Sequence, residues 1–438
     1  MKQAALTILT TFTLAIAAGT ALLLLPISTH SGSISVEDAC FTATSAVTVT
    51  GLIVVDTATA FTRFGQTVIL LLLQFGGLGF MTFSTLIILL TGKSISVSGS
   101  MMLENDFTPG RYRNLRDLVT KIFLLTLGLE LLGTAVLFLQ LRGMNTADRL
   151  FSAVFHSISA FCNAGFSIFS NSFEDFTGDL GINATLSLLI VCGGIGFLVL
   201  NEIYLFVRRR IARVSRFSLH TKLVVSVSII LTLGGFLVIL LQELGQPQNT
   251  LPLGEKILAA LFQSVTARTA GFNTVNLNVL SAASVWVILF LMFIGASPGS
   301  TGGGVKTSTA GMALAYVRAR LRGREGIDLF YRRIPGPTIE KAFTVINLSF
   351  LLISVSVLLL LTFERSTPLT DILFEAVSAF GTVGLSMGIT PALSLGSKIT
   401  IMLTMFIGRI GPLTLLIALS RRESRAVYDY PRENVMIG

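Results

Sequence analysis

The sequence has few charged residues, few cysteines and few histidines for its length of 438 residues. Only 13% of the residues are Asp, Glu, Lys or Arg, whereas 52% are hydrophobic, and this balance lies outside the range of soluble globular domains. The three cysteines, Cys40, Cys162 and Cys192, are too few and too scattered for a disulfide framework or a C-x-x-C metal site. A basic isoelectric point in such a chain reflects membrane topology rather than nucleic-acid binding. The composition therefore indicates an integral membrane protein.

The sequence contains several long apolar runs. Eight of them are long enough to cross about 30 Å of hydrocarbon, and they lie near residues 4–26, 65–91, 118–140, 182–207, 220–242, 283–317, 341–362 and 397–420. The first run could be a cleaved signal peptide, but it fills the first-helix position of a repeating unit, so we expect it to remain. The sequence therefore predicts an all-α membrane protein with eight transmembrane helices.

The segments between paired spans share a glycine motif. They read SAVTVTGL at 45–52, SAFCNAGF at 159–166, VTARTAGF at 265–272 and SAFGTVGL at 378–385. The aligned glycines recur at intervals of 106 to 114 residues, which indicates one supersecondary unit copied four times. We therefore divide the chain into four tandem helix, pore-loop, helix repeats, at residues 1–92, 93–208, 209–318 and 319–438.

Each motif glycine follows about a dozen mostly apolar residues that begin with an acid. The first-turn acids are Glu37, Asp38, Asp148, Glu255 and Asp371, and carboxylates there favour a helix N-terminus. Twelve residues make a helix of about 18 Å, which enters a membrane without crossing it. We therefore predict four re-entrant pore helices around a central pore. Their loops can turn carbonyl oxygens toward a dehydrated monovalent cation, and the acids would concentrate cations at the mouth.

The predicted selectivity filter takes three backbone positions from each repeat. Successive carbonyls can face one side only where the backbone adopts angles that a side chain would hinder, which explains the glycines. The filter residues are Val49, Thr50, Gly51, Asn163, Ala164, Gly165, Thr269, Ala270, Gly271, Thr382, Val383 and Gly384.

These motifs resemble the Trk, Ktr and HKT superfamily of potassium transporters, and specifically its KtrB-type bacterial subunits. The resemblance spans essentially the whole chain and also rests on GASPGSTGGG at 295–304 and GRIGP at 408–412. It implies potassium uptake across the bacterial plasma membrane by a homodimer docked on a cytosolic, nucleotide-binding regulatory ring of the RCK type. Some plant members carry serine at the first filter glycine and select sodium, whereas all four positions here are glycine. Sodium dependence stays open, and a sodium-selective or sodium-coupled member of the superfamily is the alternative.

The span at 283–317 is interrupted by the glycine-rich run 295–304, which cannot continue a helix comfortably. The resemblance implies that this run is an intramembrane gate below the filter. Arg409, an ionisable residue at membrane depth, is expected to stabilise the closed gate through bonds to loop carbonyls, or to limit cation occupancy below the filter. Simple bonding between helices is the alternative. A phosphate-binding reading fails because Val305 separates Gly304 from Lys306. The predicted gate residues are Gly295, Gly299, Gly302, Gly303, Gly304, Lys306 and Arg409.

Three further expectations concern residues within or beside the spans. Lys306 is placed near the cytoplasmic interface, and Arg268, inside the third filter segment, is expected to pair with a pore-helix acid such as Glu375. The GGLG run at 76–79 and the GGIG run at 193–196 lie inside spans, where close helix packing explains them better than a dinucleotide site.

Most cations lie on the face opposite the pore loops. That face contains the N-terminus, the loops 92–117, 208–219 and 318–340, and the C-terminal tail. By the positive-inside rule it is cytoplasmic, and its arginines also suit lipid headgroups. A solute symporter is disfavoured because such proteins usually contain inverted repeats. An enzyme is disfavoured because His30, His156 and His220 lie in dissimilar places and form no metal-ligand spacing. No bound cofactor is expected.

Overall fold

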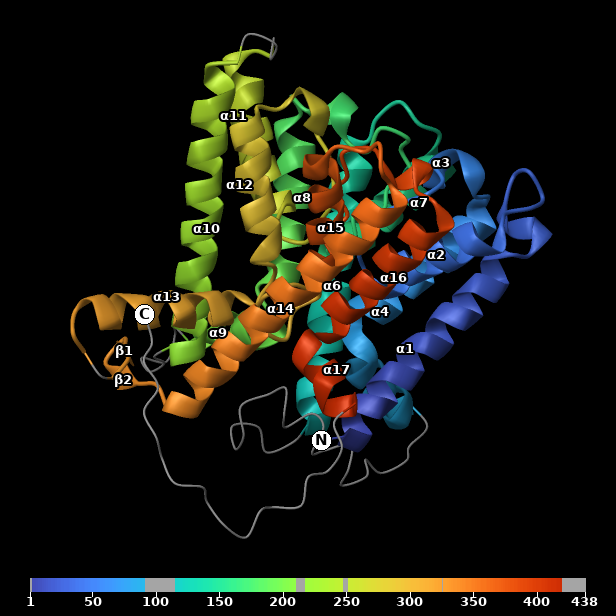
Figure 1. Ribbon diagram of the computed structural model, residues 1–438. Coiled ribbons are helices and arrows are strands. Elements are labelled where there is room, and N and C mark those ends of the chain that lie inside the picture. The colour runs from blue at the N-terminus through green and yellow to red at the C-terminus, as the bar shows by residue number, and fades with distance from the viewer. Residues whose placement is uncertain (1, 91–114, 210–216, 247–250, 325, 420–438) are drawn as a thin grey trace.

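The computed structural model describes residues 2–90, 115–209, 217–246, 251–324 and 326–419. Most of the predicted loops 92–117 and 208–219, and the C-terminal tail, lie outside these residues. Within them the order of long helix, short buried helix, loop and second helix occurs four times (Figure 1). We call these successive groups units 1 to 4.

The helices of each unit have the following bounds. Unit 1 contains α1 (Lys2–Leu23), α2 (Val36–Thr48), α3 (Thr57–Ala60) and α4 (Arg63–Leu90). Unit 2 contains α6 (Leu115–Gln140), α7 (Thr146–Phe161), α8 (Leu180–Gly194) and α9 (Phe197–Arg209). Unit 3 contains α10 (Leu219–Leu244), α11 (Leu253–Thr266), α12 (Ala282–Phe293) and α13 (Thr307–Leu321). Unit 4 contains α14 (Gly336–Phe363), α15 (Leu369–Gly381), α16 (Leu395–Ile410) and α17 (Pro412–Leu419). Single 3₁₀ turns lie at Pro26–Ser28, Glu174–Phe176, Leu277–Val279 and Thr390–Ala392.

The first helix of each unit is long and apolar. By length and composition, residues 5–23, 120–140, 219–244 and 336–363 can each cross a membrane. Their apolar faces stay exposed on the outside of the helix assembly, as at Leu131 and Leu237, which are 60% and 53% exposed. Exposed leucines in such number suit a lipid surface rather than water.

The short second helices α2, α7, α11 and α15 lie inside the assembly. Side chains cap two of them, because Ser35 accepts from the amide of Asp38 at 3.0 Å and Asn145 accepts from the amide of Asp148 at 2.9 Å. These contacts satisfy amides that a helix N-terminus leaves free. The C-terminal halves of the four helices are almost wholly buried. The C-terminal ends of these four helices are therefore enclosed by other elements of the protein.

The last helix of every unit is interrupted. The bent pair α8 and α9 turns by 107°, and the glycines at the three bends, Gly79, Gly196 and Gly411, have φ of 76°, 96° and 91°. Only glycine adopts such angles readily. The runs predicted at 65–91, 182–207 and 397–420 therefore each contain a bend that was not predicted, whereas the break predicted within 283–317 is present between α12 and α13.

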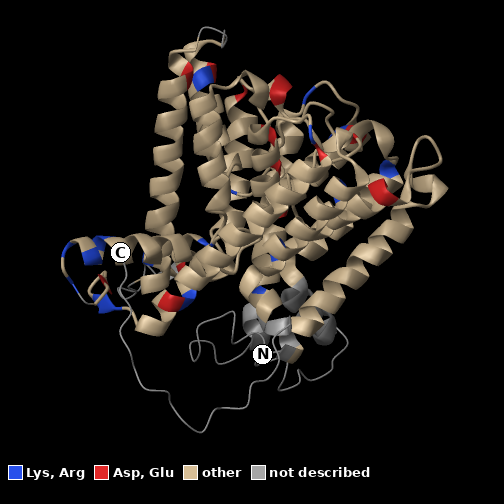
Figure 2. Ribbon diagram, in the orientation of Figure 1, with Lys and Arg blue, Asp and Glu red and all other residues tan. Residues whose placement is uncertain are grey.

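One pair of strands interrupts the helical pattern. Strand β1 (Asp328–Leu329) pairs antiparallel with β2 (Arg332–Arg333), and Asp328 lies opposite Arg333. The turn contains Phe330 and Tyr331, both with positive φ. The all-α prediction missed this hairpin. Arginines gather on it and on the end of α13, whereas most acidic residues lie at the opposite end of the molecule (Figure 2).

Candidate functional site

The four filter segments share one unusual backbone conformation. Their glycines, Gly51, Gly165, Gly271 and Gly384, have φ of 92°, 67°, 77° and 92°. The residues two positions earlier, Val49, Asn163, Thr269 and Thr382, also have positive φ, between 49° and 79°. Left-handed residues are uncommon outside glycine. Alternating them with residues at negative φ turns successive carbonyl groups toward the same side of an extended chain.

The four glycines form a closed ring. A methyl group on Gly51 would lie 2.3 Å from the carbonyl oxygen of Ala164, and one on Gly165 would lie 2.9 Å from that of Ala270. The series continues with Gly271 at 2.2 Å from the oxygen of Val383, and Gly384 at 2.2 Å from the oxygen of Thr50. Each unit therefore contacts the next, and unit 4 contacts unit 1. All the predicted filter residues are buried except Gly165 and Gly384, which are partly exposed.

Hydroxyl groups of the pore helices hold the filter backbone. The amide of Gly51 donates to Ser45 Oγ at 3.0 Å, and the amide of Gly384 donates to Ser378 Oγ at 3.1 Å. In unit 2, Ser159 Oγ donates to the carbonyl of Phe166 at 2.7 Å. In units 1 and 4 these bonds satisfy the amide of the filter glycine, whereas in unit 2 the hydroxyl group binds the carbonyl of the residue after it.

A cavity of about 270 Å³ lies directly outside the ring. The four filter glycines line its floor, and Asp56, Asn171, Glu174 and Asn273 line its walls. Burial, and the neighbouring Asp175, raise the pKa of Glu174. The polar walls suit a hydrated cation waiting at the filter.

The first-turn acids of the pore helices are only in part free for this role. Asp148 pairs with Arg63, and Lys398 Nζ lies 2.8 Å from Asp38 and 3.6 Å from Glu37. Both ion pairs join the start of one unit's last helix to the next unit's pore helix. They therefore contribute to assembly of the ring as well as to the charge at its mouth.

The glycine-rich run lies against the inner side of the filter. The amide of Gly303 donates to Thr382 Oγ1 at 3.0 Å, and a methyl group on Gly302 would lie 2.1 Å from Thr269 Oγ1. Thr301 donates through its amide to the carbonyl of Gly193 at 3.2 Å. The loop thus contacts units 2, 3 and 4 at the level just below the filter residues.

Two predicted gate cations bind the loop carbonyls. Arg409, on α16, donates to the carbonyl of Thr301 in the loop, as expected from the sequence, and also to the carbonyl of Gly76 in α4, which was not predicted. Lys306 Nζ donates to the carbonyl of Gly302 at 2.7 Å. The lysine thus folds back onto its own loop instead of only marking the membrane interface.

The expected pairing of Arg268 with Glu375 was wrong. Arg268 donates instead to α10, through bonds to the carbonyl and hydroxyl of Ser228 and to Thr232 Oγ1, at 3.1 to 3.2 Å. Glu375 accepts a bond from Thr390. A serine and a threonine four residues apart on an otherwise apolar helix face were the only signal for the true partner of Arg268.

The histidines and acidic residues of the described part of the chain do not form a metal-binding cluster. No group of three His, Cys, Asp or Glu there could hold a metal ion. His156, on α7, is fully buried. His30 lines a groove on the outer face together with Arg63 and Asp148.

Comparison with known proteins gives consistent matches. The sequence matches the TrkH family, described as cation transport protein, over residues 1–430. It is 40% identical to the Ktr system potassium uptake protein B of Bacillus subtilis (strain 168), over 98% of this chain and 95% of that protein. The protein of that same name from Vibrio alginolyticus is 38% identical, over 95% of this chain and 91% of the relative.

Two further matches extend the comparison. The potassium/sodium uptake protein NtpJ of Enterococcus hirae is 35% identical, over 96% of this chain and 94% of that protein. The crystal structure of the potassium transporter TrkH from Vibrio parahaemolyticus superposes with a TM-score of 0.74 at 20% identity, covering 96% of this chain and 85% of that one. The latter match shows a shared fold.

Proposed function

Because this chain belongs to the TrkH family of cation transport proteins, we propose that it takes up potassium through the ring formed by its four filter segments. The observation that carries this proposal is the ring itself. Each of the four filter glycines has a positive φ and contacts, in the next unit, the carbonyl group of the residue before that unit's filter glycine. A ring of inward carbonyls can replace the water shell of a monovalent cation without a fixed charge.

The proposed path runs from the outer cavity through the ring to the glycine-rich loop. Asp56 and Glu174 at the cavity wall raise the local cation concentration. An ion then loses water to the carbonyls of the filter residues, while the C-terminal ends of α2, α7, α11 and α15 direct negative partial charge toward the centre. The loop below the ring blocks further passage.

We place the gate in the run 295–304. Gly299, Gly302, Gly303 and Gly304 give it the freedom to adopt a second arrangement. Bonds from Arg409 and Lys306 to its carbonyls stabilise the closed one. Potassium conduction requires those bonds to break. The glycines of the gate and of the filter therefore serve different ends, movement in one case and fixed geometry in the other.

The chain is a multi-pass membrane protein, and we propose eight spans with both termini in the cytoplasm and unit boundaries at 92/93, 208/209 and 318/319. The basic hairpin and the end of α13 then face the cytosol. Relatives named as proteins of a Ktr system support a partner subunit. We place a homodimer on a nucleotide-binding ring that docks at this basic face, where anionic lipid headgroups also bind.

Growth of a potassium-uptake-deficient bacterium expressing the full chain tests this function. Expression should lower the potassium concentration needed for half-maximal growth. Sodium is titrated in the same assay, because one relative carries potassium/sodium in its name. Equal growth with and without the chain, despite its presence in the membrane, would reject potassium uptake. Growth that depends on sodium would assign it to the coupled branch.

The filter itself is tested by Gly51→Ser. A side chain at this position would meet the carbonyl oxygen of Ala164 at 2.3 Å and would sit at a φ of 92°. The ring must then widen at one corner, so the preference for potassium over sodium should fall. An unchanged ratio of rubidium to sodium uptake would contradict the assignment of the filter.

A further inference from the structure

The pore helices of units 2 and 4 differ from those of units 1 and 3 at one buried position. Nine residues before the filter glycine, units 2 and 4 have the ionisable side chains His156 and Glu375, both 0% exposed. Units 1 and 3 have Thr42 and Phe262 at the same position, 2% and 1% exposed. Equal burial with different chemistry makes the four positions a natural comparison.

His156 ties α7 to the chain that leaves the filter. Its Nδ1 lies 2.9 Å from the carbonyl of Ser152, so this nitrogen carries the proton. Its Nε2 therefore accepts, from Ser167 Oγ at 3.0 Å and from the amide of Ile168 at 3.3 Å. Ser167 is the second residue after Gly165. The residues that follow the filter glycine of unit 2 are thus fixed to the pore helix of the same unit.

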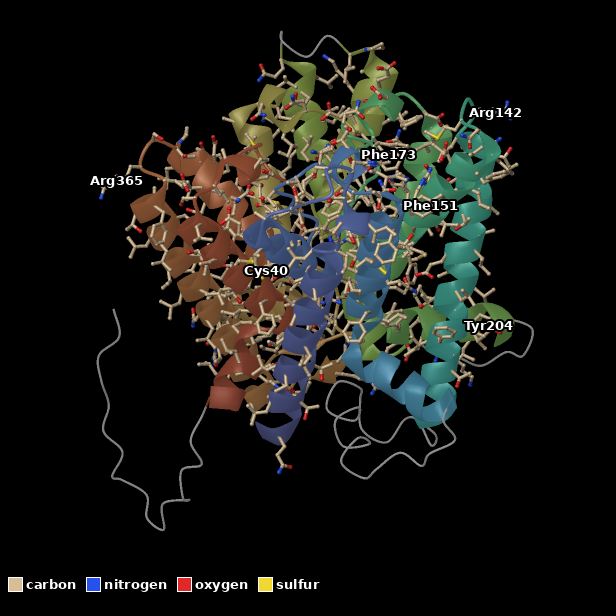
Figure 3. All side chains as sticks on the ribbon, turned by 90° about the vertical axis from the view of Figure 1, so that its right-hand side faces the viewer. Cys40, Arg142, Phe151, Phe173, Tyr204 and Arg365 are labelled. Atoms are coloured by element: carbon tan, nitrogen blue, oxygen red, sulfur yellow. The ribbon has the colours of Figure 1, made fainter. Side chains whose placement is uncertain are left out.

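Aromatic rings enclose His156 and hold its orientation. The ring centroids of Phe169 and Phe173 lie 4.5 Å and 4.8 Å from that of the histidine. Phe173 lies among the loops at the outer end of the molecule (Figure 3), and it also contacts Phe272, the residue after the filter glycine of unit 3, at 5.5 Å. The imidazole is therefore held in one position between the pore helix and the filter exit.

Glu375 makes the corresponding connection in unit 4. Its Oε1 accepts from Thr390 Oγ1, and that hydroxyl lies 2.9 Å from Ser386 Oγ. Ser386 is the second residue after Gly384, so Thr390 links it to the carboxyl group. The two units thus use different side chains to hold a serine at the same position of the filter exit, His156 directly and Glu375 through Thr390.

The other two units lack this connection. The second residue after the glycine is Ile53 in unit 1 and Asn273 in unit 3. Thr42 Oγ1 has no hydrogen-bond partner, and the amide of Asn273 donates instead to Ser172 of unit 2, at 3.2 Å. Because the glycine ring runs in the order of units 1, 2, 3 and 4, the two connected units face each other across the axis.

We propose that His156 and Glu375 are positioning residues that fix the outer end of the filter along one diagonal and thereby set its preference among monovalent cations. The inference rests on the proposed function of the ring as a potassium filter. Selectivity depends on the separation and the mobility of the carbonyl groups. Two stiff corners and two adaptable corners keep the ring from closing around a smaller ion such as sodium.

The experiment compares four changes in the full-length protein expressed in the uptake-deficient bacterium. Glu375→Leu and His156→Leu remove the accepting atoms. Thr42→Val and Phe262→Leu change the matched positions of units 1 and 3. We measure rubidium and sodium uptake separately, together with the melting temperature of each purified protein. Loss of a buried hydrogen bond should lower the ratio of rubidium to sodium uptake by about three- to tenfold, and the matched changes should leave it unaltered.

Milder variants cover the case in which a leucine prevents folding. Glu375→Gln keeps an oxygen that accepts from Thr390 and removes the ionisable group, so it should restore the wild-type ratio. Ser167→Ala removes the partner of His156 without introducing a larger side chain, and it should lower the ratio as His156→Leu does. A merely structural role would change melting temperature and total uptake without changing the ratio.

The outcomes separate this inference from the proposed function. Rubidium uptake by the wild type with an unchanged ratio in Glu375→Leu and Ser167→Ala would overturn the positioning role and leave potassium uptake intact. An equal loss in Glu375→Gln and Glu375→Leu would show that charge, not the hydrogen bond, matters, and would also overturn it. Absence of rubidium uptake by the wild type would instead reject the proposed function.

Discussion

The last helices of units 1, 2 and 4 each turn at a glycine, whereas the last helix of unit 3 is interrupted by the loop of residues 294–306. In units 1, 2 and 4 a packing glycine lies three residues before the glycine at the turn. A methyl group on it would meet the carbonyl of the pore helix of its own unit, at 1.8 to 2.1 Å. These packing glycines are Gly76, Gly193 and Gly408, and the turns are at Gly79, Gly196 and Gly411.

Unit 3 keeps the first glycine and changes the second. Gly295 stands at the packing position, but a methyl group on it would meet the carbonyl of Gly303, at 2.3 Å, instead of a pore helix. Pro298 stands where the other units have the glycine of the turn. The loop has thus folded back into the place where a helix would pack. The position that forms a fixed bend in units 1, 2 and 4 therefore belongs, in unit 3, to the loop that we assign as the gate.

The largest effect is expected where the bend is fixed most tightly. In Gly193→Ala the new methyl group would lie 1.8 Å from the carbonyl oxygen of Phe161. Backbone on both sides must shift, at more than about 3 kcal/mol, so little folded protein should remain. Gly234→Ala in α10 is the control, because a methyl group there meets nothing within 4 Å. The melting temperatures of the two solubilised variants are compared with that of the wild type. An unchanged value for Gly193→Ala would show that α8 and the pore helix α7 are not in contact at this position.

The next effect concerns the movable loop. Arg409→Ala removes the bonds to the carbonyls of Thr301 and Gly76. A bond from a charged donor contributes about 1.5 to 3 kcal/mol, so rubidium uptake should rise about tenfold and depend less on the regulatory partner. Deletion of residues 299–304 should act in the same direction. Arg365→Ala, at an exposed position (Figure 3), is the control. Lower uptake by a folded Arg409→Ala protein would mean that the arginine supports the open filter.

A smaller effect is expected where a bend has open space around it. Gly79 has a φ of 76° and a ψ of 150°, and a methyl group on it meets no atom within 4 Å. Gly79→Ala therefore introduces backbone strain alone, of about 1 to 2 kcal/mol, and should lower the melting temperature by less than Gly193→Ala does. A reversed order of the two melting temperatures would contradict the distinction between packing glycines and glycines at turns.

The smallest effect concerns the ion pairs that join neighbouring units. Lys398 is 10% exposed and lies 2.8 Å from Asp38, whereas Arg63 and Asp148 are each 48% exposed. Exposed pairs contribute about 1 kcal/mol or less. Lys398→Met should therefore lower the melting temperature slightly, and Arg63→Met by less. Both differences should shrink at high salt, and a larger effect at high salt would exclude an ionic origin.

The repeated parts of this structure could be predicted from sequence, whereas the partner of an individual buried side chain could be predicted only in part. The four glycine motifs predict four equivalent loops, and the structure brings those loops into one ring. The bond from Arg409 to the loop was also anticipated, because an arginine inside an apolar span needs acceptors and a broken helix supplies them.

Contacts between side chains far apart in the sequence depended on three-dimensional placement. Arg268 finds hydroxyl groups on α10 rather than Glu375, and nothing along the chain ranks those partners. The turns at Gly79, Gly196 and Gly411 left a signal in the repeated G-x-x-G spacing. Uniform apolar composition concealed it, because hydropathy reports that a segment suits lipid without reporting its direction.

Closure of the glycine ring within a single polypeptide has a genetic consequence. In a channel assembled from four identical subunits, one codon change alters all four corners together. Here each corner has its own codon, so the asparagine at 163, the alanines at 164 and 270 and the valine at 383 could diverge separately. A single mutation therefore alters only one of the four filter segments. Selectivity can change gradually during evolution, one segment at a time.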